Sequence, residues 1–144
     1  TLIFILISIL SKAQTSEKLP YENIPDSVFQ NVEVEAAFPG GPISWYRYVK
    51  RELENKNIDL KKYENEGACE IQFKVNREGV VSDVTALTLV DTKLAKALIS
   101  IIKKGPRWLP AIQNGRQVSS WRKIEISYPI ENSVFWHIKN VKQD

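Results

Sequence analysis

The residue types that most often carry out chemistry in proteins are scarce in this sequence. The chain of 144 residues holds one histidine, His137, and one cysteine, Cys69. Nucleophilic catalysis needs a base beside the nucleophile, most often a histidine, but His137 stands in the C-terminal tail. Cys69 falls on the apolar side of an expected strand, where a thiol is usually a packing residue. One histidine and one cysteine do not make the usual zinc sites or a disulfide framework. We therefore expect no catalytic residue, no metal site and no cofactor.

Two further groups of residues could do chemistry by their spacing. Glu33 and Glu35 are two apart, so on a strand they would share a face and could act as a carboxylate pair; solvated surface is the simpler interpretation. Trp108 and Trp121 lie in a run over residues 103–123 that holds six Lys or Arg and no acid. Aromatic rings between cations suit single-stranded nucleic acid or a cell-wall glycan. The net charge of +3 is too small to indicate a polyanionic partner, and we expect Trp108 to fill the space between a helix and the sheet. A glycan binder or hydrolase remains an alternative; a nucleic-acid partner is not expected.

The N-terminus indicates export. The run TLIFILISIL is followed by Ser11-Lys12-Ala13, which is typical of a secretory signal peptide over residues 1–13, cut after Ala13. An uncleaved membrane anchor is the alternative. Either way the domain is expected to be exported. Residues 14–37 are polar and lack a sustained period, so we expect a flexible or surface-laid lead segment. Within it, alternation at Val32, Val34 and Ala36 indicates a short extended edge strand.

The elements that would position these residues follow from periodicity. Residues 42–55 fit a helix with Tyr46, Val49 and Leu53 on the apolar face and Ile43 one turn earlier. Alternation over 69–75 predicts a strand, and a turn at 76–79 with Gly79 in the left-handed region leads into a second strand over 80–90.

The second half of the domain shows cap, turn and strand signals in its sequence. Asp91 is the expected N-cap of a helix that ends at Gly105-Pro106, and Asn114-Gly115 signals a tight turn. A last strand alternates as far as Ile130. One-sided alternation indicates an antiparallel sheet with one solvated face. The predicted fold class is therefore α+β: a small antiparallel three-stranded sheet with two helices packed on one face.

The stretch Phe38-Pro39-Gly40-Gly41-Pro42 stands at the start of the first helix. Two glycines there could expose N–H groups to an anion, or turn the chain so that Pro42 begins the helix. No cofactor fingerprint surrounds them, which favours the turn, with Phe38 as a core residue.

The last strand is the remaining candidate site. If it lies at the sheet edge, its N–H and C=O groups are unpaired, and such an edge can accept an extended peptide as an extra strand without catalytic side chains. Proline at Ile126 would then be expected to abolish peptide capture. The edge could also serve a homodimer, which the sequence leaves open.

Four stretches, taken in order, resemble the C-terminal domain of TonB in the form common in Bacteroidota: VEVEAAFPGG (32–41), IQFKVNREGVVSDV (71–84), KLAKALISIIKKGPRW (93–108) and WLPAIQNGRQVSSWRKIEISYPI (108–130). The chain departs from the family where Tyr63 is followed by glutamate instead of proline, and a long proline-rich spacer is absent. The motif residues are Phe38, Pro39, Gly40, Gly41, Trp108, Pro110, Asn114 and Gly115.

The resemblance implies a domain over 38–131, a tail over 132–144 and a non-enzymatic role. TonB-like domains bind a short peptide of outer-membrane transporters by strand addition, often on the final strand. Carried over, the peptide-binding strand comprises Arg122, Lys123, Ile124, Glu125, Ile126, Ser127 and Tyr128. The expected partner is an outer-membrane transporter or another envelope protein. The resemblance also implies a location in the periplasm or elsewhere in the cell envelope, with anchoring to the inner membrane if the N-terminal apolar run is retained. A membrane-anchored TonB energy transducer with a truncated N-terminus is the alternative within the family.

Overall fold

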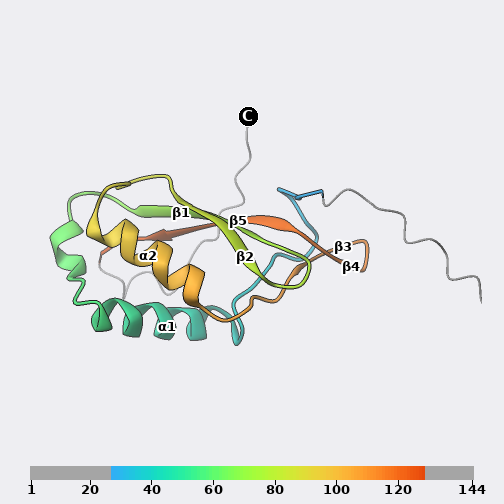
Figure 1. The fold of residues 1–144 in the computed structure, drawn as a ribbon, viewed down its shortest axis with the longest axis horizontal. Helices are drawn as coiled ribbons and strands as arrows, with labels where there is room; N and C mark the ends of the chain where they lie inside the picture. The colour runs from blue at the N-terminus through green and yellow to red at the C-terminus, as the bar shows by residue number, and fades with distance from the viewer. Residues whose placement is uncertain (1–26, 129–144) are drawn as a thin grey trace, which may run out of the picture.

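The computed structural model describes residues 27–128. The expected signal peptide over 1–13, most of the lead segment, His137 and the tail over 132–144 therefore lie outside the described residues. The elements are, in chain order, α1 (Gly41–Asn55), the 3-10 helix η1 (Leu60–Tyr63), β1 (Cys69–Val75), β2 (Val81–Ala86), α2 (Lys93–Lys104), β3 (Ala111–Gln113), β4 (Arg116–Val118) and β5 (Ser120–Ile126) (Figure 1).

The main sheet has three antiparallel strands in the order β2-β1-β5. Helix α2 packs on β1 and β2, and α1 packs beside α2, so that both helices lie on one face of the sheet (Figure 1). The predicted α+β fold is confirmed. The structure adds a second, two-stranded sheet, because β3 and β4 form a hairpin whose turn residues Asn114 and Gly115 both have positive φ, 51° and 70°.

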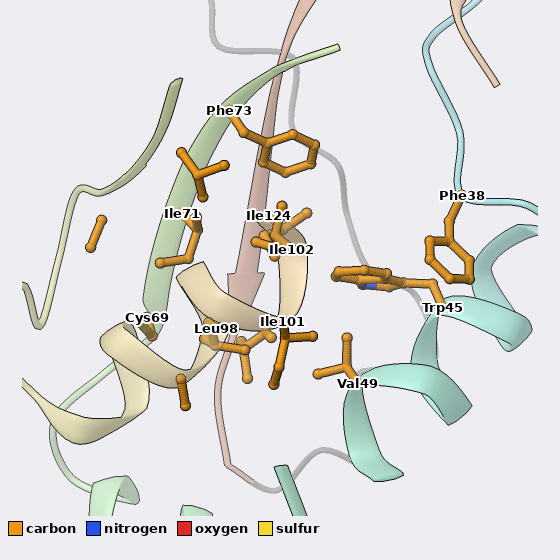
Figure 2. Close-up of a cluster of buried hydrophobic side chains, with 14 of the residues drawn as sticks. Phe38, Trp45, Val49, Cys69, Ile71, Phe73, Leu98, Ile101, Ile102 and Ile124 are labelled. Carbon is orange, nitrogen blue, oxygen red and sulfur yellow. The ribbon is translucent and has the colours of Figure 1, made fainter. Parts of the chain in front are cut away.

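The core lies between the helices and the sheet. Strand β1 buries alternate side chains, as does β5, and both rows face α2 (Figure 2). The helices bury their stripes against these rows: Trp45, Val49 and Leu53 from α1, and Leu94, Ala95, Ala97, Leu98, Ile101 and Ile102 from α2. Apolar burial of this kind is the main stabilising term of such a small domain.

An aromatic cluster closes the end of the core where α1 begins. The ring of Phe38 lies 5.1 Å from that of Trp45 and 5.8 Å from that of Trp108, and Trp108 lies 5.0 Å from Phe73. Gly40 and Gly41 have φ of 82° and 78°, which glycine adopts without strain. The Gly41 N–H donates to the Phe38 carbonyl oxygen at 2.9 Å. The two glycines thus reverse the chain between Phe38 and the helix.

The hairpin turn after β1 is held against the segment that follows α2. The Trp108 N–H donates to the Gly79 carbonyl oxygen at 2.9 Å, and Gly79 has φ of 82°. A Cβ at this position would lie 2.0 Å from the Trp108 carbonyl oxygen. Only glycine therefore allows the two backbones to approach this closely.

Two predicted helix features were wrong. In α1, Trp45 and not Ile43 joins Val49 and Leu53 in the core, and Ile43 is 63% exposed. The stripe at Trp45, Val49 and Leu53 keeps a four-residue spacing and buries the larger ring. In α2 the N-cap is Thr92, since its Oγ1 accepts the Ala95 N–H at 3.1 Å; Asp91 stands one residue too early.

Two strand boundaries also differ from the prediction. Strand β2 ends at Ala86. Beyond it, the Thr88 hydroxyl replaces the main chain as the partner of the segment that leads into β1: its Oγ1 donates to the Ala68 carbonyl oxygen at 2.6 Å and accepts the Glu70 N–H at 2.8 Å. Strand β5 begins at Ser120 and ends at Ile126, so Ser127 and Tyr128 follow the strand.

Candidate functional site

The candidate site is the outer edge of β5, and the ladder decides which main-chain groups face it. Strand β5 pairs with β1 without interruption, from Ser120 opposite Val75 to Ile126 opposite Cys69. The Trp121 N–H donates to the carbonyl oxygen of Phe29, which lies outside the three-stranded sheet, at 3.0 Å. In an antiparallel ladder the hydrogen-bonded pairs alternate. Trp121, Lys123 and Glu125 therefore direct their N–H and C=O groups away from β1.

Only the start of this edge is occupied within residues 27–128. Phe29 pairs in parallel with Ser120, its N–H donating to the Ser119 carbonyl oxygen at 2.9 Å. Past this bridge no other described strand pairs with β5. The main-chain groups of Lys123 and Glu125 therefore form a short, regular edge that an extended segment could join.

The opposite edge of the sheet is irregular. The pairing of β2 with β1 shifts register between Gln72 and Lys74, and Asp83 has φ of 51°. The Asp83 carboxylate also accepts the Ser82 hydroxyl at 3.0 Å. A bulge with a charged residue is a common device that prevents further pairing at an edge. Of the two edges, β5 is the one suited to strand addition.

Side chains on the solvated face of β5 are half-buried and polar or aromatic. They are Trp121, Lys123 and Glu125. The Lys123 ammonium lies 3.3 Å from the Glu70 carboxylate on β1. This ion pair partly neutralises the charge of Lys123. A peptide added beside β5 would therefore meet an aromatic ring and side chains of both charges, and we expect the site to have no strong preference for acidic or basic peptides.

The core side of β5 carries a buried cation. The Arg122 side chain is 2% exposed, and its Nη1 lies 2.6 Å from the Glu35 carboxylate, while its Nε has no partner among the described residues. Burial lowers the pKa of Arg122, and the charge of Glu35 and its hydrogen bond oppose that shift. The pair fastens the lead segment to the sheet.

The structure separates the residues that the sequence assigned to the docking strand. Lys123 and Glu125 lie with their main chains on the outer edge. The side chains of Arg122, Ile124 and Ile126 are buried, and their main chains face β1. Ser127 and Tyr128 are half-buried beyond the end of the strand.

The lead segment contributes residues that sequence reasoning missed. Val34 and Ala37 form antiparallel bridges with Ile112 and Leu109, so the segment joins β3 as well as β5. Alternation over 32–36 indicated an extended segment but held no signal for its partner, and Phe29 stood outside the alternation. Glu33 and Glu35 do not form a carboxylate pair: Glu33 accepts the Asn114 N–H at 3.3 Å, whereas Glu35 binds Arg122.

The other candidate residues are buried in packing positions. Trp108 is 4% exposed among aromatic rings, so it has no free face for a glycan. Cys69 is fully buried, and burial raises the pKa of its thiol to about 11, with a smaller contribution from Glu70. Among the described residues no cluster of His, Cys, Asp or Glu could hold a metal ion. Across residues 27–128, none of the helices is long and apolar enough to span a bilayer.

A two-helix layer on a three-stranded antiparallel sheet places residues 27–128 in the class of small α+β sandwiches. A model of the Gram-negative bacterial TonB protein C-terminal family matches residues 59–130, which is half of the chain. The chain belongs to this family, as the resemblance implied. Neither the curated proteins nor the solved structures compared with the chain give a match. Family membership makes it a TonB-like protein-interaction module of the envelope, of a non-enzymatic type whose members interact with outer-membrane transporters.

Proposed function

We propose that this protein takes an extended peptide of an outer-membrane transporter as a fourth strand along the outer edge of β5. The observation that carries the proposal is the orientation of Lys123 and Glu125, whose main-chain N–H and C=O groups face away from β1. Strand addition draws its affinity from such groups and needs no catalytic side chain. The bulge at Asp83 supports the choice of β5 over β2.

The proposal includes export. The apolar run over residues 2–10 and the small residues at 11 and 13 support a cleaved signal peptide and a domain that works in the periplasm. A homodimer through the same edge would compete with the peptide, because both would use the main-chain groups of Lys123 and Glu125.

The test uses proline as a selective deletion of a donor. Glu125→Pro removes an N–H that faces the outer edge, and proline is tolerated in an edge strand when its nitrogen faces outward. We expect Glu125→Pro to fold and to lose binding to synthetic peptides from the periplasmic N-terminal segments of outer-membrane transporters, measured by calorimetry. Full-strength binding by the folded variant would contradict strand addition on β5.

Two controls complete the experiment. Glu125→Gln removes the charge and keeps the N–H, so it is expected to bind like the original chain. Ile126→Pro, expected from the sequence to abolish peptide capture, deletes a donor that faces β1 opposite Cys69. It should unfold the sheet, because a ladder hydrogen bond between two strands is lost, and circular dichroism distinguishes this outcome from selective loss of binding.

A further inference from the structure

The two helices concentrate positive charge on one face of the molecule. Together α1 and α2 hold seven Lys or Arg and two Glu, a net charge of +5, whereas the whole chain has +3. Both helices lie on the same side of the sheet (Figure 1). On the solvated face of the sheet, positive and negative charges are nearly equal in number. The charged strand residues there are Glu70, Lys74, Asp83, Lys123 and Glu125.

Helix α2 shows the pattern most clearly. Its exposed residues are all lysines, namely Lys93, Lys96, Lys103 and Lys104. Within residues 27–128 none of the four takes part in an ion pair. Helix α2 holds no carboxylate; the exposed carboxylate of α1 is Glu54, and Asp91 precedes α2 by two residues. The lysines are therefore free to meet an anionic surface.

The two helices that carry these basic side chains are in direct contact. The Arg51 guanidinium lies 5.6 Å from the centre of the Tyr48 ring, and the Tyr48 hydroxyl donates to the Ile101 carbonyl oxygen of α2 at 3.0 Å. This contact places α1 against the last turn of α2, where Lys103 and Lys104 lie. Arg47, Lys50 and Arg51 continue the charge along α1, with Arg51 paired to Glu52 at 3.2 Å.

This face also carries the most exposed of the large hydrophobic side chains within residues 27–128. Ile43 is 63% exposed and lies four and seven residues before Arg47 and Lys50, so the three share one stripe of α1. Lysine and arginine around an exposed aliphatic side chain are typical of surfaces that rest on a membrane, where the cations meet phosphates and the apolar group enters the interface. A soluble polyanion has no apolar region into which the Ile43 side chain could insert.

We propose that the layer formed by α1 and α2 binds the surface of an anionic phospholipid bilayer, with the edge of β5 left free. The partner is defined by its chemistry: a plane of phosphate head groups that neutralises the lysines of α2, with Ile43 inserted shallowly. This surface is separate from the β5 edge, so either proposal can fail without the other.

The experiment measures partition of the full chain onto vesicles of phosphatidylglycerol mixed with phosphatidylcholine, and onto phosphatidylcholine alone. Any contribution of the apolar residues 2–10 is common to both, so the difference reports the basic face. We expect stronger binding to anionic vesicles, reduced about tenfold or more in Lys96→Gln/Lys103→Gln and abolished by high salt. Glutamine keeps helix propensity close to that of lysine.

The matched control removes the same charge elsewhere. Arg77→Gln/Arg116→Gln alters two exposed cations outside the helices, one on the turn after β1 and one at the start of β4, and it should retain most of the anionic preference. Ile43→Ser should weaken vesicle binding but leave binding to heparin unchanged. Equal losses in the two charge variants, or binding to heparin without binding to anionic vesicles, would overturn the proposal.

Discussion

At the scale of single residues, both the backbone conformation and the close contact with Trp108 require glycine at position 79. Its φ is 82°, and a Cβ would lie 2.0 Å from the Trp108 carbonyl oxygen. Gly115 also has a positive φ, 70°, but a Cβ there would meet only open space, with nothing beyond its chain neighbours within 4 Å. We expect Gly79→Ala to lower the free energy of unfolding by about 2–4 kcal/mol and Gly115→Ala by about 1 kcal/mol in urea titrations. Equal losses of unfolding free energy in the two variants would mean that the close contact with Trp108 does not add to the destabilisation by Gly79→Ala.

The pair between Glu35 and Arg122 gives a second residue-scale prediction. Glu35→Gln leaves a buried guanidinium without its counter-charge, which is more destabilising than losing an exposed pair. Since Glu35 is itself 28% exposed, we expect a loss of about 1–3 kcal/mol in unfolding free energy. Glu33→Gln keeps an oxygen for the Asn114 N–H and should change stability by less than about 0.5 kcal/mol. A loss confined to Glu33→Gln would contradict this assignment.

Cys69 provides a prediction about pH. Its folded pKa is raised to about 11 from an ordinary 9.0, so the protonated thiol is the form that the fold favours. The stabilisation is present below pH 9 and is lost as the pH rises towards 11. The unfolding free energy should fall by up to about 2 kcal/mol more over this range in the original chain than in Cys69→Ala. Parallel pH profiles for the two chains would show that the thiol is not buried in this way.

At the scale of elements, the lead segment should protect the first outward amide of β5. Removing residues 1–31 deletes Phe29, whose carbonyl oxygen accepts the Trp121 N–H at 3.0 Å. We expect hydrogen exchange at Trp121 to accelerate, while β1 amides stay protected because their partners in β2 and β5 remain. Unchanged protection of Trp121 would mean that the bridge to Phe29 is absent in solution.

Periodicity predicted the main elements because their burial is one-sided. The row Cys69, Ile71, Phe73 and Val75 alternates, and every member is buried. Local capping was less predictable, since Asp91 and Thr92 are both good cap residues one position apart, and only the structure shows that the Thr92 Oγ1 accepts the Ala95 N–H. Pairings between segments far apart in sequence, such as Phe29 with Ser120 and Glu35 with Arg122, carry no local pattern and needed the structure.

At the scale of the whole molecule, the same fold presents two distinct surfaces. One is the edge of β5, where main-chain groups of Lys123 and Glu125 are available. The other is the basic outer face of α1 and α2. The candidate strand could be predicted from its alternation and from the family resemblance. Its position at an edge depends on the order β2-β1-β5, which the sequence left open because the connection after α2 could have led to either side.

The most direct test of the central claim is amide hydrogen exchange, followed by NMR, at Lys123 and Glu125 in the presence and absence of a transporter-derived peptide. Strand addition would bond these two outward amides and should slow their exchange about tenfold or more, with little change at Ile124, whose amide already faces β1. A peptide that binds by calorimetry but leaves both amides exchanging at their free rate would contradict the account.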